Sequence, residues 1–427
     1  MTSPVPWCNV VAIVSPPREP AISAPSSSAH AVAPSLDSLE REQRLHALDI
    51  LRGLAILGMI VVHWHQMIGV EATGWRDLMA WGVWVLVEQK SWGIFAFLFG
   101  AGFAVFLRRL EARGDPVVPI YLRRLAALAF FGVVAEVVFG FNVLFEYAYW
   151  GLVLLAVRRW PSGALLALAF VAACAGPLAT LWTGTPPWAI DPSLVKAEAA
   201  AVQGSDYWPL LAVRWVLFLD QIPDTWPELL PNVNLMLFVL GLLAVRHHVI
   251  DEPRRHLRVI VGMMGFGALA WAGWWLVLRH LGSEPRSAAL ASGLGLIREQ
   301  WLCFTYIGAV VLLLAYRPWW TERLALFGEA GRVALTNYLL QVAVVDLLAS
   351  GYGLGLRLTP PAYLVGGVLL FTVQALASRV WLRRYRMGPL EWIWRVVTYW
   401  RPQPLRRSAL DRAAPRLGRI RRPPAMR

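Results

Sequence analysis

Runs of about twenty mostly apolar residues recur along most of this chain, and a helix of that length can cross the hydrocarbon core of a bilayer. The mean hydropathy of +0.51 and the 57% hydrophobic residues, with 23 tryptophans among the 427, agree with this pattern. We therefore predict an all-α, polytopic integral membrane protein with about ten transmembrane helices. The predicted spans are residues 48–69, 91–107, 121–139, 142–157, 163–182, 232–245, 257–278, 297–316, 333–348 and 362–382.

The arginines predict how these spans are oriented. They mark the short loops, and nine of them lie within residues 401–427 against the single acid Asp411. Basic loops stay on the cytoplasmic side, so we expect both termini in the cytoplasm and membrane lipids, rather than nucleic acid, as the partner of the +13 charge. The predicted organisation is a disordered cytoplasmic arm (1–40), a single transmembrane domain (44–400) and a basic cytoplasmic tail (401–427). Oligomeric state is left open, and the three cysteines have no metal-ligand spacing.

The first span carries two ionisable groups at membrane depth. Between Ile50 and Trp64 the strongly polar side chains are Arg52 and His63. They are eleven residues apart, which places them on one edge of a helix, about 20° out of phase and roughly 16 Å apart along the axis. Such residues are costly in lipid and are usually retained for function. Arg52 as a snorkelling anchor, and His63 as a polar group satisfied by a neighbouring helix, remain alternatives.

Other polar side chains lie inside or beside later spans. Glu136 and Glu146 fall near the external side, toward which His63 also leans. Asn337 and Gln341 are four residues apart on one helix face, where they can bind a ligand, although hydrogen bonding between helices is the commoner use. Residues 210–230 form an amphipathic segment that is too polar to span alone and is suited to cap a cavity.

Several motifs carry a resemblance to a known family. The runs RLHALDILRGLAILGM and LFGAGF, and above all GRVALTNYLLQ (331–341) with GPLEWIWRVVTY (388–399), resemble the YeiB-like membrane proteins. The carboxy-terminal region of that family, about residues 230–400 here, is the DUF418 domain of unknown function. The resemblance implies the bacterial cytoplasmic (inner) membrane as the location.

The spacing of Arg, ten residues and His resembles membrane acyltransferases that O-acetylate bacterial surface glycans. The YeiB-like proteins look like distant relatives of these enzymes and of the lysosomal heparan glucosamine acetyltransferase. In such enzymes the histidine is considered catalytic and the arginine important, which implies these roles for His63 and Arg52.

The resulting hypothesis is transfer of an acetyl or other acyl group from cytoplasmic acyl-CoA to a glycan or envelope metabolite, without a metal. His63 would be the base. Arg52 and Arg332 would bind the CoA phosphates, and Glu136, Glu146, Asn337 and Gln341 would orient the imidazole or the acceptor. We expect a cavity that opens near Arg52 and ends at His63. The alternative is a non-enzymatic permease or envelope scaffold.

Overall fold

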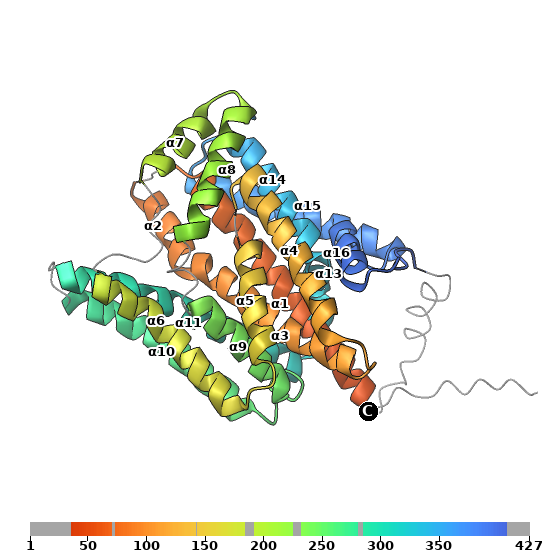
Figure 1. Cartoon of the computed structure of the whole chain (residues 1–427). Helices are drawn as coiled ribbons and strands as arrows, with labels where there is room; N and C mark the ends of the chain where they lie inside the picture. Colours follow the sequence, from red (N-terminus) through yellow and green to blue (C-terminus); the bar gives the residue numbers. More distant parts are fainter. Residues whose placement is uncertain are drawn as a thin grey trace, which may run out of the picture.

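The computed structural model describes residues 36–70, 73–141, 143–183, 192–224, 232–280 and 285–407, and throughout these ranges the regular structure is helical (Figure 1). The predicted all-α fold is therefore confirmed for this part of the chain. The helices are α1 (Leu36–Met67), α2 (Trp75–Val83), the π-helix η1 (Trp84–Glu88), α3 (Gln89–Glu111), α4 (Val117–Phe139), α5 (Leu144–Val157), α6 (Ser162–Thr183), α7 (Pro192–Gln203), α8 (Tyr207–Asp224), α9 (Val233–Arg246), α10 (Leu257–His280), α11 (Pro285–Tyr316), α12 (Trp320–Arg323), α13 (Ala325–Arg332), α14 (Ala334–Ala349), α15 (Pro360–Arg384) and α16 (Pro389–Tyr399).

Each of the ten predicted spans coincides with a helix, but the helices differ in length. Five helices are long and apolar enough to cross a membrane, and six if α13 and α14, bent by 84° at their junction, count as one. Helices α5 and α9 and the apolar parts of α6 and α11 are shorter. The number of ten spans and the cytoplasmic position of the termini therefore remain predictions.

The division into an arm, a transmembrane domain and a tail stays a prediction, and the start of α1 falls within the predicted arm. The helix begins at Leu36, inside the segment 1–40 that was expected to be a disordered arm. Residues 36–44, LDSLEREQR, are rich in strong helix formers, which extend the first span toward the amino terminus. The rest of the arm and the tail beyond residue 407 lie outside the described residues.

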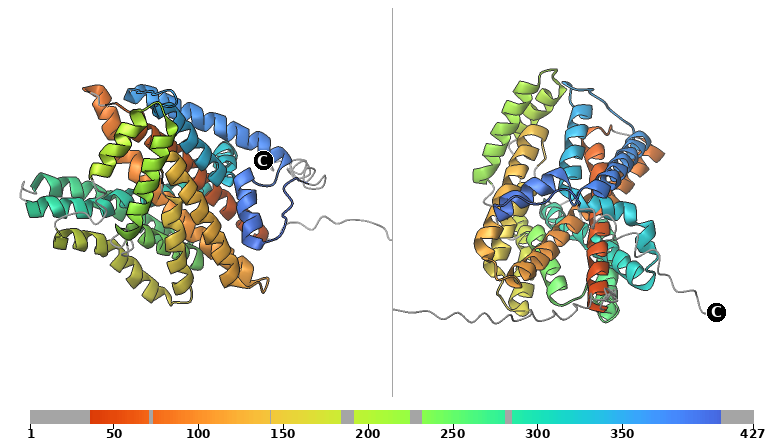
Figure 2. Two further views of the ribbon diagram at one scale, coloured as in Figure 1. Left: turned by 45° about the horizontal axis from the view of Figure 1, so that its top comes forward. Right: turned by 90° about the vertical axis from the view of Figure 1, so that its right-hand side faces the viewer.

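Helix α1 occupies the middle of the bundle, where it packs against α3, α13, α14 and α15 (Figures 1 and 2). Glycines allow its closest crossing. A side chain at Gly53 would meet the backbone of Phe327 in α13, and one at Gly331 would meet the carbonyl of Asp49. Small residues at such crossings let helix backbones approach within van der Waals distance, which is how α13 is held against α1.

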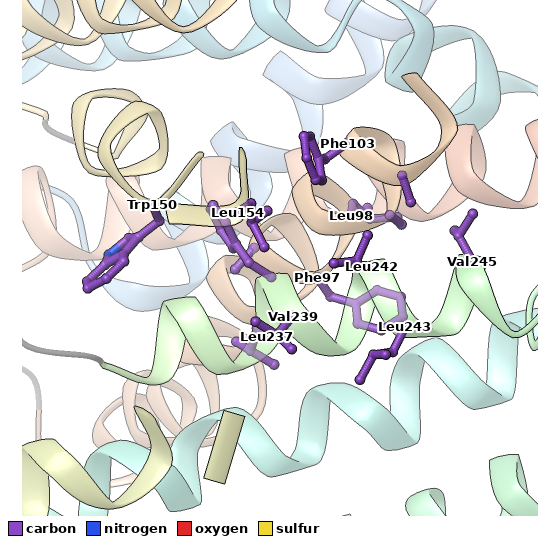
Figure 3. Close-up of a cluster of buried hydrophobic side chains, with 14 of the residues drawn as sticks. Phe97, Leu98, Phe103, Trp150, Leu154, Leu237, Val239, Leu242, Leu243 and Val245 are labelled. Atoms are coloured by element: carbon purple, nitrogen blue, oxygen red, sulfur yellow. The ribbon is translucent and has the colours of Figure 1, made fainter. Parts of the chain in front are cut away.

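A second close crossing joins α3 to α9 and anchors the largest apolar core. Gly100 lies against the backbone of Phe238, and Gly241 against that of Phe97. Gly100 and Gly241 thus let the two helix backbones approach closely. Figure 3 shows the core around this crossing, with Phe97, Trp150 and Leu242 among the buried side chains.

The outer surfaces of several helices are apolar. On α15, Val365 and Leu369 are 69% and 62% exposed, and on α6 Phe170 is 71% exposed. Exposed apolar faces of this extent need a non-aqueous neighbour. With the long apolar helices, they indicate a membrane protein.

Helix α16 caps the start of α14 through a carboxylate. Glu391 Oε1 accepts hydrogen bonds from the backbone N–H groups of Leu335 (2.6 Å) and Thr336 (3.1 Å), and Oε2 accepts one from the Thr336 hydroxyl (2.6 Å). These N–H groups lie in the first turn of α14 and have no partner within their own helix. Burial raises the pKa of Glu391, although the hydrogen bonds from Thr336 and Leu335 act to lower it. The two carboxy-terminal motifs are thus parts of one helix-capping contact.

Candidate functional site

His63 lies in the interior of the bundle, on the face of α1 toward α14 and the α4–α5 turn. Its exposed fraction is 0%, and its ring centroid lies 4.2 Å from that of Phe141 and 6.1 Å from that of Tyr338. Neither ring nitrogen has a hydrogen-bond partner in the described part of the chain. A buried polar atom without a partner costs about 1–3 kcal/mol, so such an atom calls for an explanation.

Two further polar side chains on α14 share this property. The hydroxyl of Tyr338 and both amide atoms of Gln341, three residues later, are buried without a hydrogen-bond partner among the residues described. Glu136 on α4 is half-buried and lies within electrostatic reach of Tyr338. The fold therefore brings Glu136 and α14 to the neighbourhood of His63, around an apolar cluster that includes Met59 and Phe131.

Tyr338 is the residue of this group that sequence reasoning missed. A tyrosine in an apolar run is ordinary, and nothing in its spacing marks a partner. The available signal was its position one turn before Gln341, on the same side of the predicted helix.

The arginines predicted to bind the donor lie on two helices: Arg52 on α1, about three turns before His63, and Arg332 at the end of α13. Arg52 Nη1 donates to Asp49 Oδ1 at 2.6 Å, and 29% of the Arg52 side chain is exposed. Arg332 is exposed, donates to the carbonyl of Arg386 at 3.3 Å and lies within electrostatic reach of Asp49. Arg52 and Arg332 therefore both lie near Asp49, which partly neutralises them.

The expected cavity between Arg52 and His63 is not open in this structure. Along the shared edge of α1, Ala55, Ile56 and Met59 are each at most 1% exposed, and no solvent-sized space borders His63 itself. The expectation of a cavity ending at the imidazole is wrong for this packing, because α13 and α14 press against that edge. The edge faces protein rather than lipid, and access to His63 requires side chains to move.

Glu146 and Asn337 are occupied by contacts between helices. Glu146 Oε1 accepts from Trp150 Nε1 (3.0 Å), Asn232 Nδ2 (3.1 Å) and Asn234 Nδ2 (2.8 Å), and so holds the start of α9 against α5. Asn337 Nδ2 donates to the carbonyl of Ala330 (3.1 Å) across the α13–α14 break and lies 3.0 Å from Ser378 Oγ on α15. These bonds position helices rather than a ligand.

A buried ion pair fastens α8 to α14, at the end of the bundle opposite the start of α1 (Figure 1). Arg214 donates to both carboxylate oxygens of Asp346 (2.7 and 3.3 Å), and the two side chains are 2% and 0% exposed. Burial acts to lower the pKa of Arg214, but the hydrogen bonds and charges of Asp346 and Glu198 outweigh it, and the pKa is raised.

The same guanidinium contacts the turn that covers His63. Arg214 Nη1 donates to the carbonyl of Val138 (3.0 Å) and lies against Gly140, whose φ of +77° is left-handed. The next residue, Phe141, is the ring that packs on the imidazole. The amphipathic segment predicted to cap a cavity thus packs, through α8, over the turn beside His63. Within the described residues, no three His, Cys, Asp or Glu side chains are grouped as a metal site.

The helices and the buried histidine define a polytopic α-helical membrane protein with a polar site inside the bundle. Residues 244–401 match the family model described as protein of unknown function (DUF418), and residues 44–219 match the catalytic model of heparan-alpha-glucosaminide N-acetyltransferase. The chain belongs to the DUF418 family, as the motifs predicted. The second match begins within α1, includes Arg52 and His63, and ends within α8.

This chain also matches three relatives over almost the whole length of each. The uncharacterized protein YxaH of Bacillus subtilis is 30% identical over 405 residues, which are 86% of this chain and 98% of YxaH. An uncharacterized 39.9 kDa protein of Bacillus acidopullulyticus is 27% identical over 381 residues (87% and 98%), and YeiB of Escherichia coli is 26% identical over 400 residues (83% and 96%). No solved structure matches this chain.

Proposed function

We propose that this protein is a membrane acyltransferase that moves an acetyl or similar group from cytoplasmic acyl-CoA to a hydroxyl or amine of a glycan or envelope metabolite. The observation that carries the proposal is the buried imidazole of His63, whose two nitrogens have no partner in the described chain. It lies in the region that matches the catalytic model of an acetyltransferase. A structural histidine in a membrane helix would normally find a hydrogen-bond partner.

The chemistry needs one base and one stabilised anion. A neutral imidazole accepts the proton of the acceptor hydroxyl as its oxygen attacks the thioester carbonyl. The tetrahedral intermediate then collapses and the C–S bond breaks. The leaving thiolate of CoA receives the proton from the imidazolium. The products are the acylated acceptor and CoA. The free hydroxyl of Tyr338 and the amide N–H of Gln341 are suited to donate to the oxyanion.

The donor and acceptor approach from opposite ends in this proposal. Arg52 and Arg332 supply positive charge at the cytoplasmic end, where the anionic donor would enter. Glu136 near Tyr338 supplies a carboxylate that can orient the imidazole or the acceptor. Because His63 is sealed in the packing described, the side chains between Arg52 and His63 must separate when the donor binds, as in enzymes whose sites open and close around a substrate.

The proposal is tested with the purified full-length chain in detergent and acetyl-CoA labelled in the acetyl group. Release of free CoA, read with a thiol reagent, and transfer of the label are followed with a panel of neutral and amino sugars and oligosaccharides. An acyltransferase releases CoA and labels one acceptor in equal amounts. A permease or scaffold releases no CoA above the buffer rate with any acceptor, and acetyl-CoA then leaves its thermal stability unchanged.

A further inference from the structure

A cavity of about 480 Å³ opens where α16 packs beside α4, at the end of the bundle that holds Arg52. Four arginines from three segments line it: Arg113 follows α3, Arg123 lies on α4, and Arg395 and Arg401 lie on and just after α16. Figure 1 shows α16 beside α4, far from the α7–α8 pair. Segments distant in sequence therefore converge on one basic cavity.

The charges of this cavity are not neutralised by the protein. Its lining holds one acid, Asp115, and none of the four arginines forms an ion pair with a carboxylate in the described part of the chain. The Nε of Arg123 is buried and has no hydrogen-bond partner there. Like charges gathered around one concave surface repel one another, and a bound anion would relieve that repulsion.

Aromatic rings complete the lining. Tyr399 ends α16, and the guanidinium carbon of Arg395 lies 5.7 Å from its ring centre. Trp400 follows with a left-handed φ of 54° and is 73% exposed, so it stands at the cavity as a free flat surface. Flat rings beside guanidinium groups suit a ligand that combines a planar base with phosphates.

Helix α16, which carries Arg395 and Tyr399 of the cavity, also carries Trp394. Its indole Nε1 donates to the carbonyl of Arg124 (2.8 Å), and the guanidinium carbon of Arg124 lies 3.6 Å from its ring centre. Trp394 also packs against the apolar cluster that contains Tyr338 and Met59. Trp394, one residue before the cavity residue Arg395, therefore links α16 to the apolar cluster beside His63.

We propose that this cavity binds the 3′-phospho-ADP end of the CoA donor, an inference that rests on the proposed function. The three phosphate groups of this ligand carry about four negative charges, which four arginines can neutralise. Guanidinium groups also bind phosphate in a bidentate manner. Arg52, by contrast, is already bound to Asp49. Phosphate is also the chemistry of anionic lipid headgroups, so the experiment includes a lipid arm.

The test measures binding of adenosine 3′,5′-bisphosphate by calorimetry to the full-length protein in nanodiscs of zwitterionic lipid. Arg395→Gln and Arg401→Gln change exposed side chains, so both variants should fold; Arg255→Gln, at an exposed position outside the cavity, is the matched control. We expect the Kd to rise at least about tenfold in each cavity variant and less than twofold in the control. Adenosine 5′-monophosphate should bind at least about tenfold more weakly than the bisphosphate.

Three results would overturn the inference: equal Kd values for the cavity variants and the wild type, equal binding of the two nucleotides, or loss of binding on adding phosphatidylglycerol to the nanodiscs, which marks a lipid site. The inference and the proposed function can fail separately. If the protein binds the bisphosphate through these arginines but transfers no acetyl group, the cavity inference stands and the proposed acyltransferase function is refuted. If acetyl transfer depends on His63 but the cavity variants keep the wild-type KM for acetyl-CoA, the proposed function stands and the cavity inference is refuted.

Discussion

The Arg214–Asp346 ion pair gives a sharp test of how the α7–α8 cap is held. In the variant Asp346→Asn the side chain keeps its size but loses its charge. Asp346 accepts from Arg214 twice, from Ser350 Oγ (3.0 Å) and from the Tyr352 hydroxyl (2.6 Å). The buried Arg214 guanidinium would then keep only the more distant Glu198 carboxylate, 3.4 Å from Nε and 32% exposed, as a counter-charge.

The expected cost follows from the burial of both partners. Arg214 is 2% and Asp346 0% exposed, and removing one partner of such a buried pair costs about 3–5 kcal/mol of unfolding free energy. The matched control is Glu252→Gln, which breaks an exposed pair with Arg255 (38% and 76% exposed) and should cost less than about 1 kcal/mol.

The assay is equilibrium unfolding in detergent micelles, followed by tryptophan fluorescence. A second variant, Arg214→Met with Asp346→Leu, replaces both charges by apolar groups and should cost less than the sum of the two single changes. Two results would refute the stabilising role of this pair. One is a loss of unfolding free energy for Asp346→Asn that lies within about 1 kcal/mol of the loss for Glu252→Gln. The other is a double variant whose loss equals the sum of the losses for Arg214→Met and Asp346→Leu alone.

Three further changes test the packing. Glu391→Ala removes three hydrogen bonds and leaves the first turn of α14 uncapped, so we expect a loss of about 2–4 kcal/mol in the same unfolding assay, with Glu391→Gln closer to wild type; equal stability of wild type and Glu391→Ala would argue against the cap. Gly100→Val places a side chain against the Phe238 backbone, and we expect more than about 2 kcal/mol of destabilisation, whereas Gly163→Val, at a position with open space, should show almost none in thermal scans. Glu146→Ala removes the acceptor of Asn232 and Asn234, which should speed proteolysis at the start of α9; an unchanged cleavage pattern would count against this role.

The positions of the helices could be predicted from this sequence because an apolar run of about twenty residues indicates a helix of membrane-spanning length. All ten predicted spans are helical, yet the sharp bend at Val333 was not expected. The predicted ninth span begins at residue 333, and α13, which lies just before it, packs against α1 through Gly331 and Gly53. Glycine contacts between distant segments leave no periodic signal in a single sequence.

The site could be predicted only in part for the same reason. The shared edge of Arg52 and His63 follows from helix geometry within one segment. The contacts of His63 with Tyr338 and Phe141, and the pairing of Arg214 with Asp346 over 132 residues, depend on how helices assemble. The pairing of the two carboxy-terminal motifs is the exception, since both were recognised from the sequence and Glu391 supplies the physical link.

The most direct test of the account compares two histidines on one helix. His63 has no hydrogen-bond partner in the described chain, whereas His65 Nδ1 lies 3.0 Å from the Tyr363 hydroxyl on α15. The measurement is the rate of acetyl transfer from acetyl-CoA by wild type, His63→Ala and His65→Ala, at matched amounts of folded protein. We predict that His63→Ala lowers the rate about 10²–10⁴-fold, as expected for loss of a general base, while His65→Ala stays within about threefold of wild type. Equal rates for His63→Ala and wild type would contradict the central claim.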